Sequence, residues 1–132
     1  MANAMMIAAV ATGGAIGAVL RYTTSLVVGA GIFGMAGPLA TLLVNIAGSA
    51  MMGGLTGLIA AGLVLSETWR GFFAVGLLGA LTTFSSFALD AGTLWQKQGA
   101  LMAGAYVMAS VILSLLAFGA AFWAVKHSGI WQ

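Results

Sequence analysis

The sequence predicts an all-α integral membrane protein with four transmembrane helices. Of its 132 residues, 62% are hydrophobic and only 5% are charged. The mean hydropathy of +1.14 is far above that of a soluble globular domain. Its apolar stretches are each long enough to cross a hydrocarbon core about 30 Å thick at about 1.5 Å per helical residue. They are apolar on every face, so they lack the alternation that spanning β-strands require.

The expected spans follow one another closely, so residues 1–132 are expected to form a single four-helix transmembrane domain. The first span has no Lys or Arg before it and is too long for a signal-peptide core, so we expect it to be retained. Pairs of Gly four residues apart, Gly13 with Gly17 and Gly53 with Gly57, give two helices a face that another backbone can approach closely. The spans cover about residues 4–28, 39–65, 71–95 and 100–125. We therefore expect a multi-pass protein of the cell (inner or plasma) membrane, surrounded by membrane lipid.

The basic residues give no preferred orientation in the membrane. With four spans, both termini and a loop at Ser66-Glu67-Thr68 lie on one side. Arg70 and Lys126 then fall on that side, and Arg21 and Lys97 fall on the other, an even split for the positive-inside rule. Two oppositely inserted copies can pair about a two-fold axis in the membrane plane. We predict an antiparallel homodimer, and a monomer or a parallel oligomer is the alternative.

The third span holds a dense block of polar side chains near its middle. Residues 79–87 read Gly-Ala-Leu-Thr-Thr-Phe-Ser-Ser-Phe, which is a poor continuous helix by propensity. We predict that the third helix is broken near the membrane centre. Freed carbonyls from two such breaks, meeting across a dimer axis, would suit a dehydrated monovalent cation.

Two other spans carry polar residues at helical spacing. Thr41 and Asn45 lie on one face of the second span, and Tyr106, Ser110 and Ser114 form a stripe along the fourth. Taken singly, each is consistent with bonding between helices or with bonding to its own helix. Together they form lines of hydrogen-bonding groups inside the bundle.

Aromatic and charged side chains add to this pattern. Phe84 and Phe87 are three apart on the third span, and the positive edges of their rings can attract a small anion without a charge that would trap it. Ordinary packing is the alternative for both rings. Arg21 is the charged residue of the first span and Asp90 the acid of the third. Arg21 either snorkels to the surface or raises the positive potential of a vestibule that anions enter.

The composition argues against several classes of function. The chain has no Cys, and its one His, His127, lies in the tail, which argues against a thiolate or imidazole metal site. Four basic residues are too dilute for a nucleic-acid surface, so no nucleic-acid partner is expected. Two acids, one His and scattered hydroxyls do not assemble a catalytic acid, base and nucleophile, so no enzyme is expected.

Three sequence blocks resemble the signature blocks of the Fluc (CrcB) family of small dual-topology fluoride ion channels. They are Gly13 to Tyr22, Gly37 to Asn45 and Gly79 to Phe87, and the resemblance extends over all four spans. It implies a fluoride-selective channel that exports fluoride passively. It also implies a dual-topology antiparallel homodimer with two pores and a structural sodium ion at the dimer interface.

The resemblance also implies roles for individual residues. By motif, Asn45, Phe84 and Phe87 would line the fluoride pore. Arg21 would lie near a vestibule, and the backbone carbonyls of Gly79 and Thr82 would bind sodium. The polar track of the pore would consist of Tyr106, Ser110 and Ser114, with a further hydroxyl from Thr41.

The chain departs from the family pattern at a few positions. Ala80 stands for the usual second Gly of the third block, Ser86 for the common Thr, and Asp90 for the usual Glu. Phe118 occupies the position after Ser114 at which the polar track would continue. Only Phe118 removes a proposed donor, and it leaves the extent of the track at that end open.

Two other functions remain alternatives. A small dual-topology proton-coupled multidrug exporter is also built from four short spans, but its proton site requires a membrane-embedded acid, which the first two spans lack. A non-conducting structural membrane protein would use the polar residues only to join helices. Fluoride is strongly hydrated, so a pore must replace its water with donors such as amides, hydroxyls and ring edges. The residues of this chain fit that requirement best.

Overall fold

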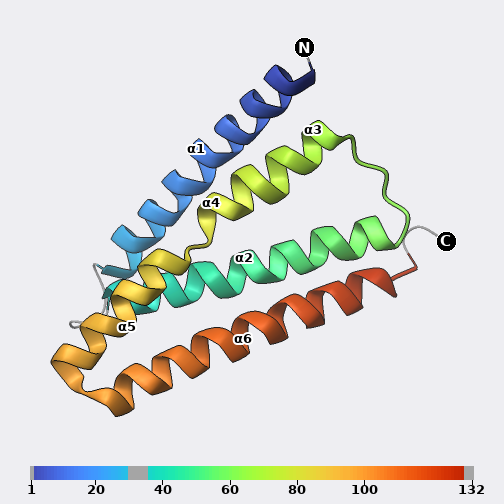
Figure 1. Ribbon diagram of the computed structural model, residues 1–132. Helices are drawn as coiled ribbons and strands as arrows, with labels where there is room; N and C mark the ends of the chain where they lie inside the picture. Colours follow the sequence, from blue (N-terminus) through green and yellow to red (C-terminus); the bar gives the residue numbers. More distant parts are fainter. Residues whose placement is uncertain (1, 30–35, 130–132) are drawn as a thin grey trace.

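The protein is a bundle of long helices (Figure 1). The computed structural model describes residues 2–29 and 36–129, and the regular structure in these ranges is entirely helical. Four helical segments are long and apolar enough to cross a membrane: Asn3–Gly29, Gly37–Ala60, Glu67–Gln98 and Ala100–Lys126. The predicted all-α class with four apolar spans is therefore confirmed, and the chain is a multi-pass membrane protein.

Helices α1 (Ala2–Gly29) and α2 (Ala36–Ala60) form the first two spans. Helix α2 ends five residues before the end of its apolar stretch at Leu65, because the chain turns at Gly62, whose φ is 114°. The predicted loop at Ser66-Glu67-Thr68 is wrong, since Glu67 and Thr68 begin helix α3 (Glu67–Arg70). Ser66 caps this helix by accepting a hydrogen bond from the backbone N–H of Trp69.

The third span is not one continuous α-helix. The π-helix η1 (Gly71–Leu78) follows α3 and leads into the single turn α4 (Gly79–Leu81). Thr82 and Thr83 then adopt extended backbone angles, with ψ of 153° and 122°. Helix α5 (Phe84–Gln98) starts after them, and a short non-helical step separates it from α4 (Figure 1). The last helix, α6 (Ala100–Lys126), follows α5 almost at once.

Glycines set how closely the helices approach. Helices α2 and α6 run side by side in the same direction (Figure 1), and a Cβ at Gly53 or Gly57 would overlap the main chain of α6 at Phe118 or Phe122. Helix α1 packs on η1 and α4 in the same way at Gly13 and Gly17. Both predicted small-residue faces are thus confirmed as close backbone contacts.

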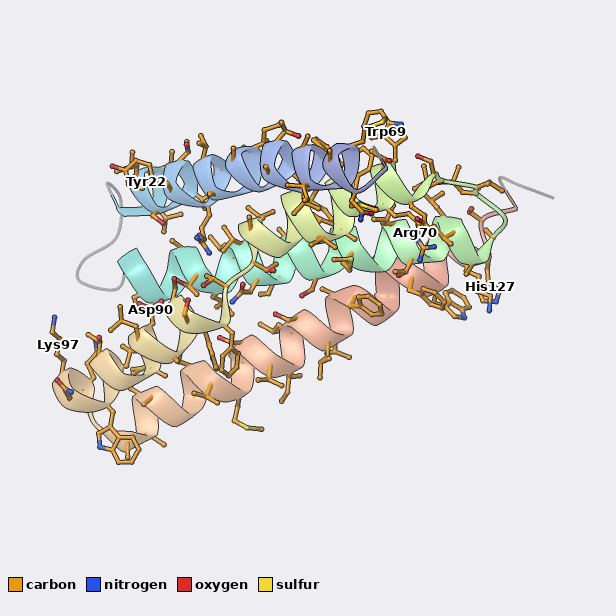
Figure 2. The ribbon with its side chains drawn as sticks, turned by 45° about the horizontal axis from the view of Figure 1, so that its top comes forward. Tyr22, Trp69, Arg70, Asp90, Lys97 and His127 are labelled. Atoms are coloured by element: carbon orange, nitrogen blue, oxygen red, sulfur yellow. The ribbon has the colours of Figure 1, made fainter. Side chains whose placement is uncertain are left out.

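Amphipathic side chains mark the two ends of the bundle. Figure 2 shows Trp69, Arg70 and His127 toward one end and Tyr22 and Lys97 toward the other. The Trp and Tyr rings among them are more than half exposed, which suits anchoring in the headgroup zone.

We expect Gly17→Ala to destabilise the fold and Gly14→Ala to leave it nearly unchanged. A methyl at Gly17 overlaps the carbonyl oxygen of Leu77, whereas a methyl at Gly14 meets no atom within 4 Å. Overpacking of this kind costs about 1 to 3 kcal/mol, and the control change lies within about 1 kcal/mol. Thermal unfolding of the detergent-purified variants measures both. Equal melting temperatures for the two variants would contradict the close contact between α1 and η1.

Candidate functional site

The side chain of Asn45 pairs with the backbone where helical hydrogen bonding stops. Its Nδ2 donates to the carbonyl oxygen of Thr83 at 3.1 Å, and its Oδ1 accepts from the N–H of Thr83 at 2.8 Å. The amide oxygen thus takes the place of the carbonyl that a continuous helix would have given this N–H, and the amide nitrogen adds a hydrogen bond to the Thr83 carbonyl. Neighbouring Gly48 lets Thr82 lie close to α2, because a Cβ there would overlap the Thr82 methyl group.

This pairing frees a carbonyl group one turn earlier. In a continuous α-helix the N–H of Thr83 would bond to the carbonyl of Gly79, but here it is used by Asn45. The N–H and the Oγ1 of Thr82 both donate to Leu78, at 3.0 and 2.9 Å. The Gly79 carbonyl therefore loses its helical donor at the place where the chain becomes extended.

Thr83 also organises the start of α5. Its Oγ1 accepts a hydrogen bond from the N–H of Ser86 at 3.2 Å, as an N-cap does, and donates to the Ser86 hydroxyl at 3.2 Å. The Ser85 hydroxyl lies at the same distance from it. Thr83 is 8% exposed, whereas Ser86 is half-buried and Ser85 is exposed, so the cluster reaches from the interior to the surface.

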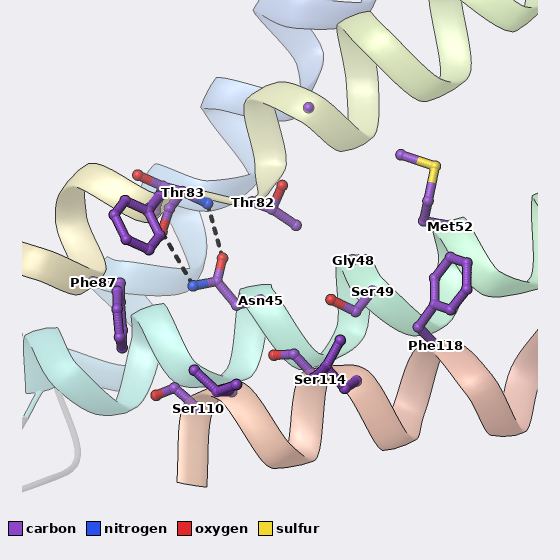
Figure 3. A pocket seen from close by; sticks show the side chains of 14 residues that line it. Asn45, Gly48, Ser49, Met52, Thr82, Thr83, Phe87, Ser110, Ser114 and Phe118 are labelled. Atoms are coloured by element: carbon purple, nitrogen blue, oxygen red, sulfur yellow. Dashed lines mark hydrogen bonds between the residues drawn. The ribbon is translucent and has the colours of Figure 1, made fainter. Parts of the chain in front are cut away.

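A groove of about 530 Å³ runs along this region (Figure 3). It brings together seven of the predicted site residues: Asn45, Gly79, Thr82, Phe84, Phe87, Ser110 and Ser114. Phe118, which we predicted to interrupt the track, lines the same groove. Two further polar residues of the lining, Ser49 and Thr83, were not among the predicted site residues. Ser49 lies four residues after Asn45, and extending the spacing by one step along the second span would have found it.

Two hydroxyls of the groove are buried without a partner. The Oγ atoms of Ser110 and Ser114 have no hydrogen-bond partner among the described residues. Ser110 is only 4% exposed. A buried hydroxyl without a partner is costly, so this wall of the groove is suited to a small polar or anionic ligand.

The aromatic residues form a connected set beside these hydroxyls. The ring centroids of Phe84 and Phe87 are 5.4 Å apart, and those of Phe87 and Tyr106 are 5.6 Å apart. Phe84 is 80% exposed, whereas Tyr106 is 8% exposed. The Tyr106 hydroxyl donates to Asp90 at 3.5 Å.

A smaller cavity of about 220 Å³ holds two of the three remaining predicted residues. Arg21 and Thr41 line it together with Tyr22, Ser25 and Ser86. Ser86 connects the two cavities, because its hydroxyl bonds to Thr83 in the wall of the larger groove. Tyr106 lines neither of these two cavities, but its ring lies 5.6 Å from that of Phe87 in the wall of the larger groove.

Comparison with known proteins gives a consistent result. Residues 8–122 match the family described as CrcB-like protein, Camphor Resistance (CrcB). A protein of Chelativorans sp. named fluoride-specific ion channel FluC is 43% identical over 117 residues, 89% of this chain and 93% of its own length. Proteins with the same name from Rhodospirillum centenum and Agrobacterium fabrum are 47% and 45% identical, over 83% and 84% of this chain and 86% and 88% of their own lengths.

We expect Asn45→Leu to destabilise the protein by about 2 kcal/mol, because it leaves the N–H of Thr83 without a partner and removes a hydrogen bond to the Thr83 carbonyl. Thr56→Val on the same helix is the matched control, since the Thr56 hydroxyl bonds only to its own helix at Met52 and Gly53. Chemical unfolding in detergent measures the two free energies. Equal stabilities would show that the Asn45 amide does not hold the backbone of Thr83.

Proposed function

This chain belongs to the CrcB-like protein family, and we propose that it is a fluoride-selective ion channel that lowers cytoplasmic fluoride by passive efflux across the cell membrane. The relatives named fluoride-specific ion channel FluC support this function over most of the chain. The observation that carries it is the groove wall of unpartnered hydroxyls at Ser110 and Ser114.

The chemistry of the groove suits a small hydrated anion. Fluoride gives up its water only if donors replace it, and hydroxyls and aromatic edges supply such contacts. Among the described residues that line the groove, none is acidic. An anion therefore meets no fixed negative charge there, and no fixed positive charge holds it against release.

We assign the individual residues to one path. Asn45, Phe84 and Phe87 contact fluoride near the middle of the path, and the hydroxyls of Thr41, Tyr106, Ser110 and Ser114 form its polar track. Arg21 faces the smaller cavity and raises the local fluoride concentration at a vestibule. These assignments draw support from the two cavities and from the unpartnered hydroxyls in the larger one.

The active form that we propose is an antiparallel homodimer, with the interruption at Thr82 and Thr83 near the membrane centre. The groove is open on one side, where Phe84 is 80% exposed and Leu115 is 67% exposed. A second copy would close it. The even distribution of basic residues supports insertion in both orientations.

A structural sodium ion at the dimer interface completes this proposal. The backbone carbonyls of Gly79 and Thr82 from both copies would hold it. Carbonyl oxygens are suitable ligands for a dehydrated monovalent cation. The Gly79 carbonyl fits this role because its helical donor is used by Asn45.

Purified protein in fluoride-loaded liposomes tests the function. We expect rapid passive fluoride efflux that needs no proton gradient. Proton-driven transport of cationic drugs would instead support an exporter, and neither activity would support a structural protein.

We expect Phe87→Ile to lower fluoride efflux by about tenfold, the effect of losing a contact worth about 1.4 kcal/mol. The change keeps an apolar side chain but removes the positive ring edge from the groove. Phe73→Ile is the matched control, because that ring stacks on Trp69 and lies outside the groove. Equal efflux rates for the two variants would remove Phe87 from the path.

We expect a single Cys introduced at Ser128 to be labelled from both sides of the membrane. The chain has no Cys of its own, so a membrane-impermeant thiol reagent reports only this position. Dual topology predicts that sealed vesicles protect about half of the sites. If the reagent labels either all of the Cys sites or none of them in sealed vesicles, the chains share one orientation. That result would refute the antiparallel arrangement.

A further inference from the structure

Helices α2 and α6 face each other in a fixed register. Gly53 lies against Phe118, and Gly57 lies against Phe122, one turn further along both helices. The two helices run in the same direction (Figure 1). One step of four residues back on each helix places Ser49 opposite Ser114, and a second step places Asn45 opposite Ser110. Figure 3 shows Ser49 and Ser114 on neighbouring helices along the same groove.

Several hydroxyls of the described residues are not available to a ligand, because each donates to a backbone carbonyl about one turn earlier in the chain. Thr12, Thr23, Thr24, Ser25, Thr56, Thr82 and Thr93 all do so. Within residues 2–29 and 36–129, no hydrogen bond uses the hydroxyl of Ser49, Ser110 or Ser114. Ser49 thus shares both the groove and the free donor with the two Ser residues of the proposed polar track.

We propose that Ser49 is a further ion-contacting residue of the channel and supplies a second donor at the level of Ser114, the last hydroxyl of the α6 row. This inference rests on the proposed fluoride conduction. Along α6 the hydroxyls end at Ser114, and one turn later the Phe118 ring lines the groove. Ser49 adds a hydroxyl opposite Ser114 from the other wall, so fluoride at this level has donors on two sides.

The polar row on α2 supports the same conclusion. Thr41, Asn45 and Ser49 follow at intervals of four, and each lines a cavity. Asn45 uses its amide on Thr83, so Ser49 is the member of the row in the larger groove with an uncommitted hydroxyl. The path is therefore lined by hydroxyls from both α2 and α6.

Fluoride efflux from liposomes containing the full-length Ser49→Ala variant tests this proposal. We expect the rate to fall about tenfold, the loss expected for one hydrogen bond to a charged ligand. Thr56→Ala removes a hydroxyl from the same helix that bonds only to its own backbone, and its rate is expected to match that of the unsubstituted protein. The double variant Ser49→Ala/Phe118→Ser returns a hydroxyl from α6 and should recover most of the rate, which a purely structural role would not produce.

Gel filtration and thermal unfolding establish that each variant is folded before transport is measured. Ser49→Cys, of nearly the same volume but with a weaker donor, serves as a second variant and should also conduct more slowly. A folded Ser49→Ala or Ser49→Cys protein with the unsubstituted rate would overturn the proposal. Absence of efflux from the unsubstituted protein would instead refute fluoride conduction itself, so the two failures are distinguishable.

Discussion

The pairing of the Asn45 amide with the peptide groups of Thr83 is the contact on which the rest of the site depends. A membrane helix can stop only where its free N–H and C=O groups find partners inside the protein. Asn45 provides them through bonds of 3.1 and 2.8 Å. Because of this pairing, Thr82 and Thr83 remain extended, Thr83 caps α5, and α5 carries Phe84 and Phe87 toward the groove.

The contacts that hold the helices together differ in kind from the groups that line the groove. Close backbone contacts at Gly17 and Gly53 fix how α1 and α2 lie on their neighbours, because no side chain can adapt there. Against this frame, the hydroxyls of Ser110 and Ser114 are held in the groove without partners, at a cost in stability. Such a cost is expected where a site is prepared for a ligand that is absent from the isolated chain.

Features that depend on local pattern could be predicted from the sequence, and features that depend on distant partners could not. Hydropathy and glycine spacing identified the spans and the two close helix contacts, because both signals repeat within one helix. The link between Asn45 and Thr83 joins positions 38 residues apart, so spacing along one helix cannot show it. The cap at Ser66 was overlooked because Ser66, Glu67 and Thr68 lie between two apolar stretches and were predicted to form a loop. Ser49 was overlooked because a lone Ser is usually bonded to its own helix.

The distribution of hydroxyls over two helices bears on how an anion can move along the groove. A site made from one helix would bind on one side only and leave the other side of the ion against apolar groups. The polar rows on α2 and α6 face each other in register. An ion can therefore contact one donor from each wall at a time and pass to the next, so no single site has to bind it tightly. The Phe118 ring ends the row of hydroxyls on α6, and Ser49 adds a second donor one turn before that ring, at the level of Ser114.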